Sequence, residues 1–146
     1  MQLQSAPHGC GPAAVVNALE ALGRRATQAA VAKLAGTGAD GTDEAGMKRA
    51  LRLLETRPEV LSTQSRAAAW HVLCGALLMG YPLLLTVDRE THWVAAVGIL
   101  GGSVLLADSA DGGIVQALGR RALLARWASG GKRPSYYAIA VHPQEE

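Results

Sequence analysis

The apolar pattern of the chain changes at Pro82, and this change constrains the fold more than any other feature of the sequence. Before Pro82, apolar residues recur at helical spacing, whereas after it they form short runs separated by turn residues. Helices followed by strands are typical of an α+β fold with separate layers, and not of an alternating parallel sheet. We therefore predict that an N-terminal helical half packs on a C-terminal antiparallel sheet.

Four helices are predicted before Pro82, three of them ending at a glycine. Asp43, or Thr42 before it, can cap the third helix, and Ser65 can cap the fourth. The glycine-rich residues 36–46 lack the Gly-Lys-Ser/Thr ending of a phosphate-binding loop, so we interpret them as a turn between helices. The predicted helices span residues 13–22, 27–35, about 43–54 and 67–79; the predicted strands span 83–87, 92–99, 104–108, 114–117 and 136–141, with a late helix over about 120–128.

The composition favours one folded domain over residues 1–146. Of the 146 residues 49% are hydrophobic and the net charge is only +2, so the chain can bury a core and is not expected to be disordered. The longest apolar stretches, residues 72–87 and 94–107, are interrupted by glycines or Pro82 and fall short of the roughly 20 residues that cross a bilayer. No membrane span is expected, and because residues 1–8 lack the features of a secretory signal, we expect a cytoplasmic protein.

Nucleic acid and metal ions are not expected partners. The 14 Lys and Arg residues are nearly balanced by 12 Asp and Glu residues, and the basic pairs are far apart in the sequence, at Arg24–Arg25, Arg120–Arg121 and Lys132–Arg133. A nucleic-acid site needs a concentrated basic patch instead. The two cysteines, Cys10 and Cys74, form no Cys-x-x-Cys pair, which favours reduced thiols over a metal site or a disulfide.

Cys10 is the best candidate for a nucleophile. Gly11 and Pro12 follow it, and a helix is predicted directly after them, so the sulfur is expected near a helix N-terminus, where unpaired backbone N–H groups stabilise negative charge. This setting lowers the pKa of a thiol, and the thiolate is the reactive form. The alternative for any cysteine is a buried apolar role, which fits Cys74 in its apolar helix.

A thiolate catalyst needs a group that holds a proton and returns it to the leaving amine, and histidine suits this task at neutral pH. His92 begins a predicted strand after a polar turn, which places it at the rim of the sheet. A surface role for His92 is the open alternative. His71 is expected on a helix, His142 lies near the tail, and His8 is too close to Cys10 in the chain to align easily with it.

Asp108 is the best candidate for orienting the His92 ring, a task commonly performed by a carboxylate or an amide. It ends a predicted strand, and a hairpin through Gly101–Gly102 would bring it roughly level with His92 on the adjacent strand. Asp111 is the fallback, although it lies in a turn-like Asp-Gly-Gly sequence.

Gln4 completes the candidate site. It precedes Cys10 by six residues, and its side-chain amide could join the backbone N–H of Cys10 in binding the oxyanion of a tetrahedral intermediate. Such a task favours a fixed neutral donor. Residue type alone is weak support, because Gln2 lies nearby.

These residues, in this order, resemble the papain-like cysteine peptidases that process bacteriocins at double-glycine leaders, the C-39 type. The resemblance covers nearly the whole chain, although Gly9 stands where the family often has an acidic residue and Ser109 where it often has a proline. The matching features are Gln4, the Cys-Gly-Pro-Ala-Ala sequence from Cys10, the His-Trp-Val sequence from His92, Asp108, the segment 40–42 with Met47 and Leu51, and the late helix ending near Trp127.

The resemblance implies a cysteine peptidase that cleaves a peptide or protein substrate, with glycine-rich, Gly-Gly-type sites as the further implication. Cys10 would be the nucleophile, His92 the general acid–base, Asp108 its orienting group and Gln4 an oxyanion donor, and no metal or organic cofactor would be required. Two alternatives stay open: an amidase, deamidase or acyltransferase with the same residues, or a non-catalytic peptide-binding module on the same fold.

Overall fold

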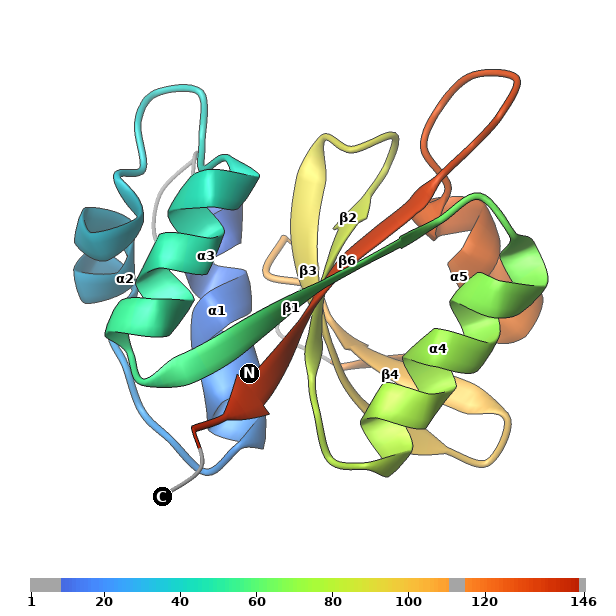
Figure 1. The fold of residues 1–146 in the computed structure, drawn as a ribbon, viewed down its shortest axis with the longest axis horizontal. Helices are drawn as coiled ribbons and strands as arrows, with labels where there is room; N and C mark the ends of the chain where they lie inside the picture. The colour runs from blue at the N-terminus through green and yellow to red at the C-terminus, as the bar shows by residue number, and fades with distance from the viewer. Residues whose placement is uncertain (1–8, 111–114, 145–146) are drawn as a thin grey trace.

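The computed structural model describes residues 9–110 and 115–144, and over these ranges it contains five helices and one six-stranded sheet (Figure 1). The helices are α1 (Cys10–Ala21), α2 (Gln28–Ala35), α3 (Glu44–Leu53), α4 (Arg66–Leu78) and α5 (Arg120–Trp127). The strands are β1 (Thr56–Thr63), β2 (Leu83–Val87), β3 (His92–Leu100), β4 (Ser103–Ala107), β5 (Gln116–Gly119) and β6 (Tyr136–Pro143). The sheet order is β1-β6-β2-β3-β4-β5, and every neighbouring pair is antiparallel. The predicted α+β fold is confirmed.

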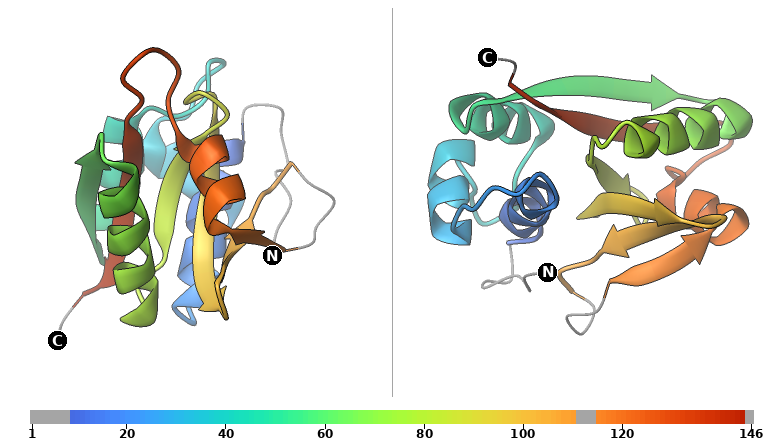
Figure 2. Two further views of the ribbon diagram at one scale, coloured as in Figure 1. Left: turned by 90° about the vertical axis from the view of Figure 1, so that its right-hand side faces the viewer. Right: turned by 90° about the horizontal axis from the view of Figure 1, so that it is seen from below.

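Helices cover both faces of the sheet, with α1, α2 and α3 on one side and α4 and α5 on the other (Figure 2). The strands supply both cores because successive side chains of a strand point to opposite faces. On β2, Leu84 packs with the α1 side, whereas Leu83 and Leu85 pack with the α4 side. The central strands are therefore buried on both faces, which explains why they are continuous apolar runs in the sequence.

The predicted helix caps are present. The Asp43 carboxylate accepts a hydrogen bond from the backbone N–H of Gly46 at 2.8 Å, so Asp43 and not Thr42 caps α3. The Ser65 hydroxyl accepts from the N–H of Ala68 at 3.1 Å and caps α4. Each cap satisfies one of the backbone donors that a helix N-terminus leaves without an intrahelical partner.

Strand β1 was not predicted, and the expectation of four consecutive helices is therefore wrong. This strand lies between α3 and α4 in the chain and pairs along its whole length with β6 at one edge of the sheet. It contains Pro58, which lacks a backbone donor and is tolerated on edge strands but argues against a strand in a sequence. Most of its side chains are exposed or half-buried, so it also lacks the apolar run that identifies β2 and β3.

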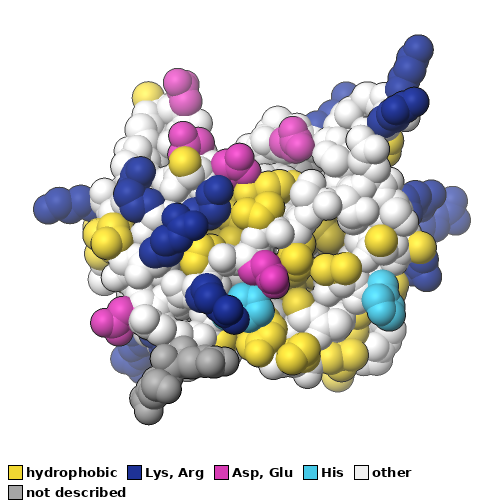
Figure 3. Space-filling view, viewed as in Figure 1, with side chains coloured by type: hydrophobic (Ala, Val, Ile, Leu, Met, Phe, Trp, Pro, Cys, Tyr) yellow, Lys and Arg dark blue, Asp and Glu magenta, His cyan; other side chains and the backbone are white. Residues whose placement is uncertain are grey.

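An apolar surface lies over β1 and α4, where Figure 3 shows exposed hydrophobic side chains. Val60 on β1 is 44% exposed and Val72 on α4 is 39% exposed. A cavity of about 220 Å³ between these elements reaches Trp127 and Tyr136. This hollow belongs to the α4 side of the sheet, opposite α1.

Candidate active site

Cys10 is the first residue of α1, as its predicted place at a helix N-terminus requires. Gly9 is the N-cap residue and supplies no side chain, and Cys10 is half-buried. A Cβ atom at Gly11 would lie 2.9 Å from Thr42 Oγ1 and 3.1 Å from Met47 Sδ. The first turn of α1 therefore packs closely against Thr42 and α3, and a side chain at position 11 would force Thr42 or Met47 to move.

His92 is the first residue of β3 and follows the turn that connects this strand to β2. Its Nε2 atom lies 2.6 Å from Oδ1 of Asp108, the residue that follows β4. The hairpin through Gly101 brings the two together, although a bulge between Ala96 and Gly98 shifts the register. The structure thus brings His92 and Asp108 together across the hairpin between β3 and β4.

Cys10 and His92 also share a side-chain hydrogen bond, which raises the pKa of His92 from 6.5 to about 9. Burial opposes this rise, and the hydrogen bond and charge of Asp108 add to it. Because Nε2 of His92 faces Asp108, its Nδ1 is the ring nitrogen left for the sulfur. The imidazole thus lies between a thiol and a carboxylate, in the arrangement of a catalytic triad.

The pKa of Cys10 is lowered even though burial of the thiol acts to raise it. The hydrogen bond and positive charge of His92 outweigh burial, together with backbone hydrogen bonds to Trp93 and Gly11. The same contact that makes His92 a stronger base makes Cys10 a stronger acid. This mutual shift favours a thiolate–imidazolium pair.

Asp108 is kept ionised inside the protein. Its side chain is only 4% exposed, and burial acts to raise its pKa, but hydrogen bonds from Arg126, His92 and the backbone of Ala110 lower it overall. Oδ1 accepts from His92 and, at 3.0 Å, from the N–H of Ala110. Oδ2 accepts from Nη2 of Arg126 at 2.5 Å.

Arg126 was not predicted as part of the site. It lies on α5, far along the chain from His92, and the sequence 120–127 contains two further arginines. No short-range spacing distinguishes it from its exposed neighbours. Only the packing of α5 against β2 and β4 brings its guanidinium to Asp108.

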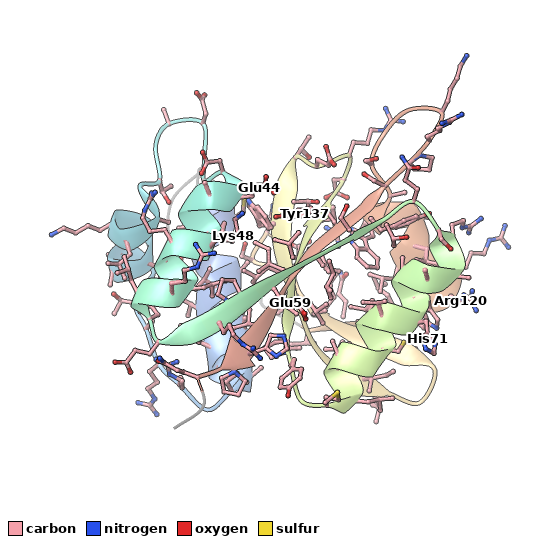
Figure 4. All side chains as sticks on the ribbon, viewed as in Figure 1. Glu44, Lys48, Glu59, His71, Arg120 and Tyr137 are labelled. Atoms are coloured by element: carbon pink, nitrogen blue, oxygen red, sulfur yellow. The ribbon has the colours of Figure 1, made fainter. Side chains whose placement is uncertain are left out.

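The other predicted candidates lie away from this cluster. Cys74 is on α4, where burial raises the pKa of its thiol although the charge of Arg120 opposes the rise. His71 is exposed on the same helix, and Figure 4 shows it on the opposite side of the sheet from α1. Nε2 of His142 on β6 lies 3.0 Å from Oε1 of Glu59 on β1. These findings favour His92 over His71 and His142.

Gln4, His8 and Asp111 lie outside the described residues, so the role proposed for Gln4 as an oxyanion donor stays a prediction. Over residues 9–110 and 115–144, the structure contains no group of three His, Cys, Asp or Glu side chains that could hold a metal ion. In the same ranges, no helix combines the length and the apolar character needed to cross a bilayer.

The family model described as the Peptidase_C39 like family matches residues 1–135 of the chain. No curated protein has a matching sequence. Among solved structures, one similar to this chain is the peptidase domain of Streptococcus ComA, which is described as a bifunctional ABC transporter involved in a quorum-sensing pathway. Its TM-score is 0.74 at 19% sequence identity, and the match covers 98% of this chain and 97% of that domain. A double glycine motif protease from an AMS/PCAT transporter, solved with its leader peptide, has a TM-score of 0.73 at 15% identity, with coverage of 97% and 89%.

A third similar structure is the N-terminal peptidase C39-like domain of a toxin secretion ATP-binding protein from Vibrio parahaemolyticus. Its TM-score is 0.67 at 9% identity, and the match covers 95% of this chain and 100% of that domain. At such identities these likenesses concern the fold, and they confirm the predicted papain-like peptidase architecture.

Proposed function

Since the chain belongs to the Peptidase_C39-like family, we propose that it is a cysteine peptidase in which Cys10, His92 and Asp108 form the catalytic triad. The observation that carries this proposal is the position of His92, which hydrogen-bonds to Cys10 on one side and to Asp108 on the other. The lowered pKa of Cys10 and the raised pKa of His92 support it. A pure binding module has no need of this mutual tuning.

The reaction begins when the Cys10 proton passes to Nδ1 of His92. The thiolate attacks the carbonyl carbon of the substrate, and the oxyanion binds the backbone N–H of Cys10 and the side-chain amide of Gln4. The imidazolium of His92 then gives its proton to the departing amine, leaving a thioester. Water, deprotonated by His92, releases the acid product and restores the thiol.

Asp108 has two roles in this proposal. Its carboxylate accepts the Nε2–H of His92 and so selects the tautomer and ring orientation in which Nδ1 faces Cys10. Its negative charge also stabilises the imidazolium that forms in each half-reaction. The carboxylate can serve both purposes because it stays ionised while buried.

Peptides are the proposed substrates, with cleavage after Gly-Gly as the finer proposal. One similar structure is named as a double glycine motif protease and was solved with a leader peptide, and the resemblance of the sequence to that group supports the same site preference here. The triad alone does not distinguish peptide hydrolysis from deamidation or acyl transfer, because all three proceed through the same thioester.

Mass spectrometry of the products separates these reactions. The purified chain is incubated with a peptide that contains an internal Gly-Gly and a glutamine, and with a matched peptide in which Ala-Ala replaces Gly-Gly. We expect two fragments, one of which ends at the second glycine, and at least tenfold less cleavage of the Ala-Ala peptide, because a site that accepts glycine closely has no room for the two added methyl groups.

The control variants are Cys10→Ala, which is expected to lose all cleavage, and Cys74→Ser, which is expected to keep it because Cys74 lies on the opposite side of the sheet. A mass increase of about one dalton without fragments would instead establish deamidation, and an adduct with an added amine would establish transfer. Cleavage that persists in Cys10→Ala would overturn the proposed mechanism.

A further inference from the structure

The turn that precedes His92 has an uncommon backbone. Asp88, Arg89 and Glu90 have positive φ angles of 54°, 59° and 65°, a left-handed conformation that costs a non-glycine residue roughly 1 kcal/mol or more. Three such residues in succession persist only where other contacts hold them. Inside the turn, the Thr91 hydroxyl donates to the carbonyl of Asp88 at 2.7 Å.

Arg126, near the end of α5, makes hydrogen bonds that hold this turn from outside. The carbonyl of Arg126 accepts from the backbone N–H of Asp88 at 3.0 Å, and its Nε and Nη2 atoms donate to Oδ1 and Oδ2 of Asp88 at 3.0 and 3.2 Å. The same Nη2 donates to Oδ2 of Asp108. A single guanidinium therefore joins the turn that leads into His92 to the carboxylate that binds the His92 ring.

We propose that Arg126 is a positioning residue for the His92–Asp108 pair, an inference that rests on the proposed function of these residues. Arg126 donates a hydrogen bond to Oδ2 of Asp108, which leaves Oδ1 directed toward Nε2 of His92. Its bond to Asp88 fixes the turn from which β3 and His92 emerge. The Arg126 side chain thus holds both the turn that leads into His92 and the carboxylate that binds the His92 ring.

Burial strengthens the hydrogen bond between Arg126 and Asp108. The Asp108 side chain is 4% exposed and that of Arg126 is 23% exposed, so water competes weakly for their bond, whereas Asp88 is 46% exposed and lies at the rim. The planar guanidinium has donors on fixed sides and can hold two carboxylates at once. A lysine is a point charge and cannot hold both carboxylates in one fixed geometry.

The test compares Arg126→Met and Arg126→Lys with the matched control Arg121→Met, an exposed arginine on the same helix. The readout is the pH dependence of Cys10 alkylation by iodoacetamide, which requires no peptide substrate. We expect Arg126→Met to lose most of the reactivity of Cys10 below pH 8, Arg126→Lys to recover part of it, and Arg121→Met to match the wild type. Asp88→Asn, which leaves the bond to Asp108 in place, is expected to have a smaller effect than Arg126→Met.

A second readout tests the geometry directly. In protein labelled with ¹⁵N-histidine, with His92 assigned by its absence from His92→Gln, we expect the slowly exchanging Nε2–H of His92 in the wild type to be lost in Arg126→Met. With a cleaved peptide, kcat should fall about tenfold to a hundredfold, as expected of a small displacement of a reacting group, while KM changes little.

The outcomes separate the two proposals. If Cys10 of the wild type reacts as an ordinary thiol, the proposed function fails. If the wild type shows reactive Cys10 but folded Arg126→Met retains the same alkylation profile and the same Nε2–H signal, the positioning role is refuted and the triad stands. Should Arg126→Met fail to fold, Arg126→Lys and Asp88→Asn decide, and wild-type profiles in both would refute the role.

Discussion

The indole of Trp93 donates a hydrogen bond from Nε1 to the backbone carbonyl of Thr42 at 3.0 Å. This bond joins β3, directly after His92, to the loop that also packs against Gly11 in the first turn of α1. The Thr42 hydroxyl is held in turn by the Thr37 hydroxyl at 2.6 Å. The segment before α3 therefore links the elements that carry the candidate nucleophile and base, a role that its turn-like sequence does not indicate.

Replacing Trp93 with phenylalanine removes the indole donor and leaves the carbonyl of Thr42 without this partner. We expect a loss of about 1 kcal/mol in the free energy of unfolding, the usual net value of such a bond, and slower alkylation of Cys10 because His92 is less well placed. Urea denaturation and iodoacetamide labelling measure the two effects. Trp70→Phe on α4 is the matched control, and equal alkylation rates for the two variants would contradict the linking role.

The pH dependence of peptide cleavage follows from the raised pKa of His92. His92 must carry its proton to release the amine, and its pKa is about 9, so the alkaline limb of the kcat/KM profile should fall as the pH rises through that value. In Asp108→Asn the carboxylate charge that helps to raise this pKa is lost, so the alkaline limb should move toward neutral pH.

The rate of Asp108→Asn should also fall roughly a hundredfold, in line with weakened general acid–base catalysis. Rate profiles of the wild type and of Asp108→Asn between pH 5 and about 10, with the same peptide, measure both effects. An alkaline limb that stays at the same pH in Asp108→Asn would show that Asp108 does not act on His92.

Two glycines inside helices should respond oppositely to alanine. A Cβ at Gly46 on α3 would lie 2.3 Å from the backbone carbonyl oxygen of Ala35, so Gly46→Ala must push α2 and α3 apart at a cost of about 1–3 kcal/mol. No atom lies within 4 Å of a Cβ at Gly75 on α4, so Gly75→Ala should stabilise the protein by roughly 0.5–1 kcal/mol. Thermal unfolding compares them, and a Gly46→Ala protein as stable as the wild type would contradict the close packing.

Much of the site could be predicted from the sequence because its signals are local. The placement of Cys10 follows from a helix start, and the meeting of His92 with Asp108 follows from a hairpin whose turn is marked by Gly101–Gly102. The bulge near Gly98 was not predicted, although a glycine inside a strand often marks one.

The parts that escaped prediction depend on long-range contacts. Strand β1 pairs with β6, which lies far along the chain, and Pro58 argued against a strand at this place in the sequence. Arg126 reaches Asp88 and Asp108 only because α5 packs beside β2 and β4. Nothing in the residues near Arg126 indicates that partnership.

Whether His92 makes a thiolate of Cys10 can be measured from the rate of iodoacetamide alkylation against pH in the wild type and in His92→Ala, with each cysteine followed by mass spectrometry. In the wild type, Cys10 should be labelled rapidly well below pH 8 while Cys74, whose pKa is raised, is labelled slowly; His92→Ala should abolish the early labelling of Cys10. If both wild-type cysteines react only near the ordinary thiol pKa of roughly 8.5, or if His92→Ala leaves the Cys10 profile unchanged, His92 does not ionise Cys10.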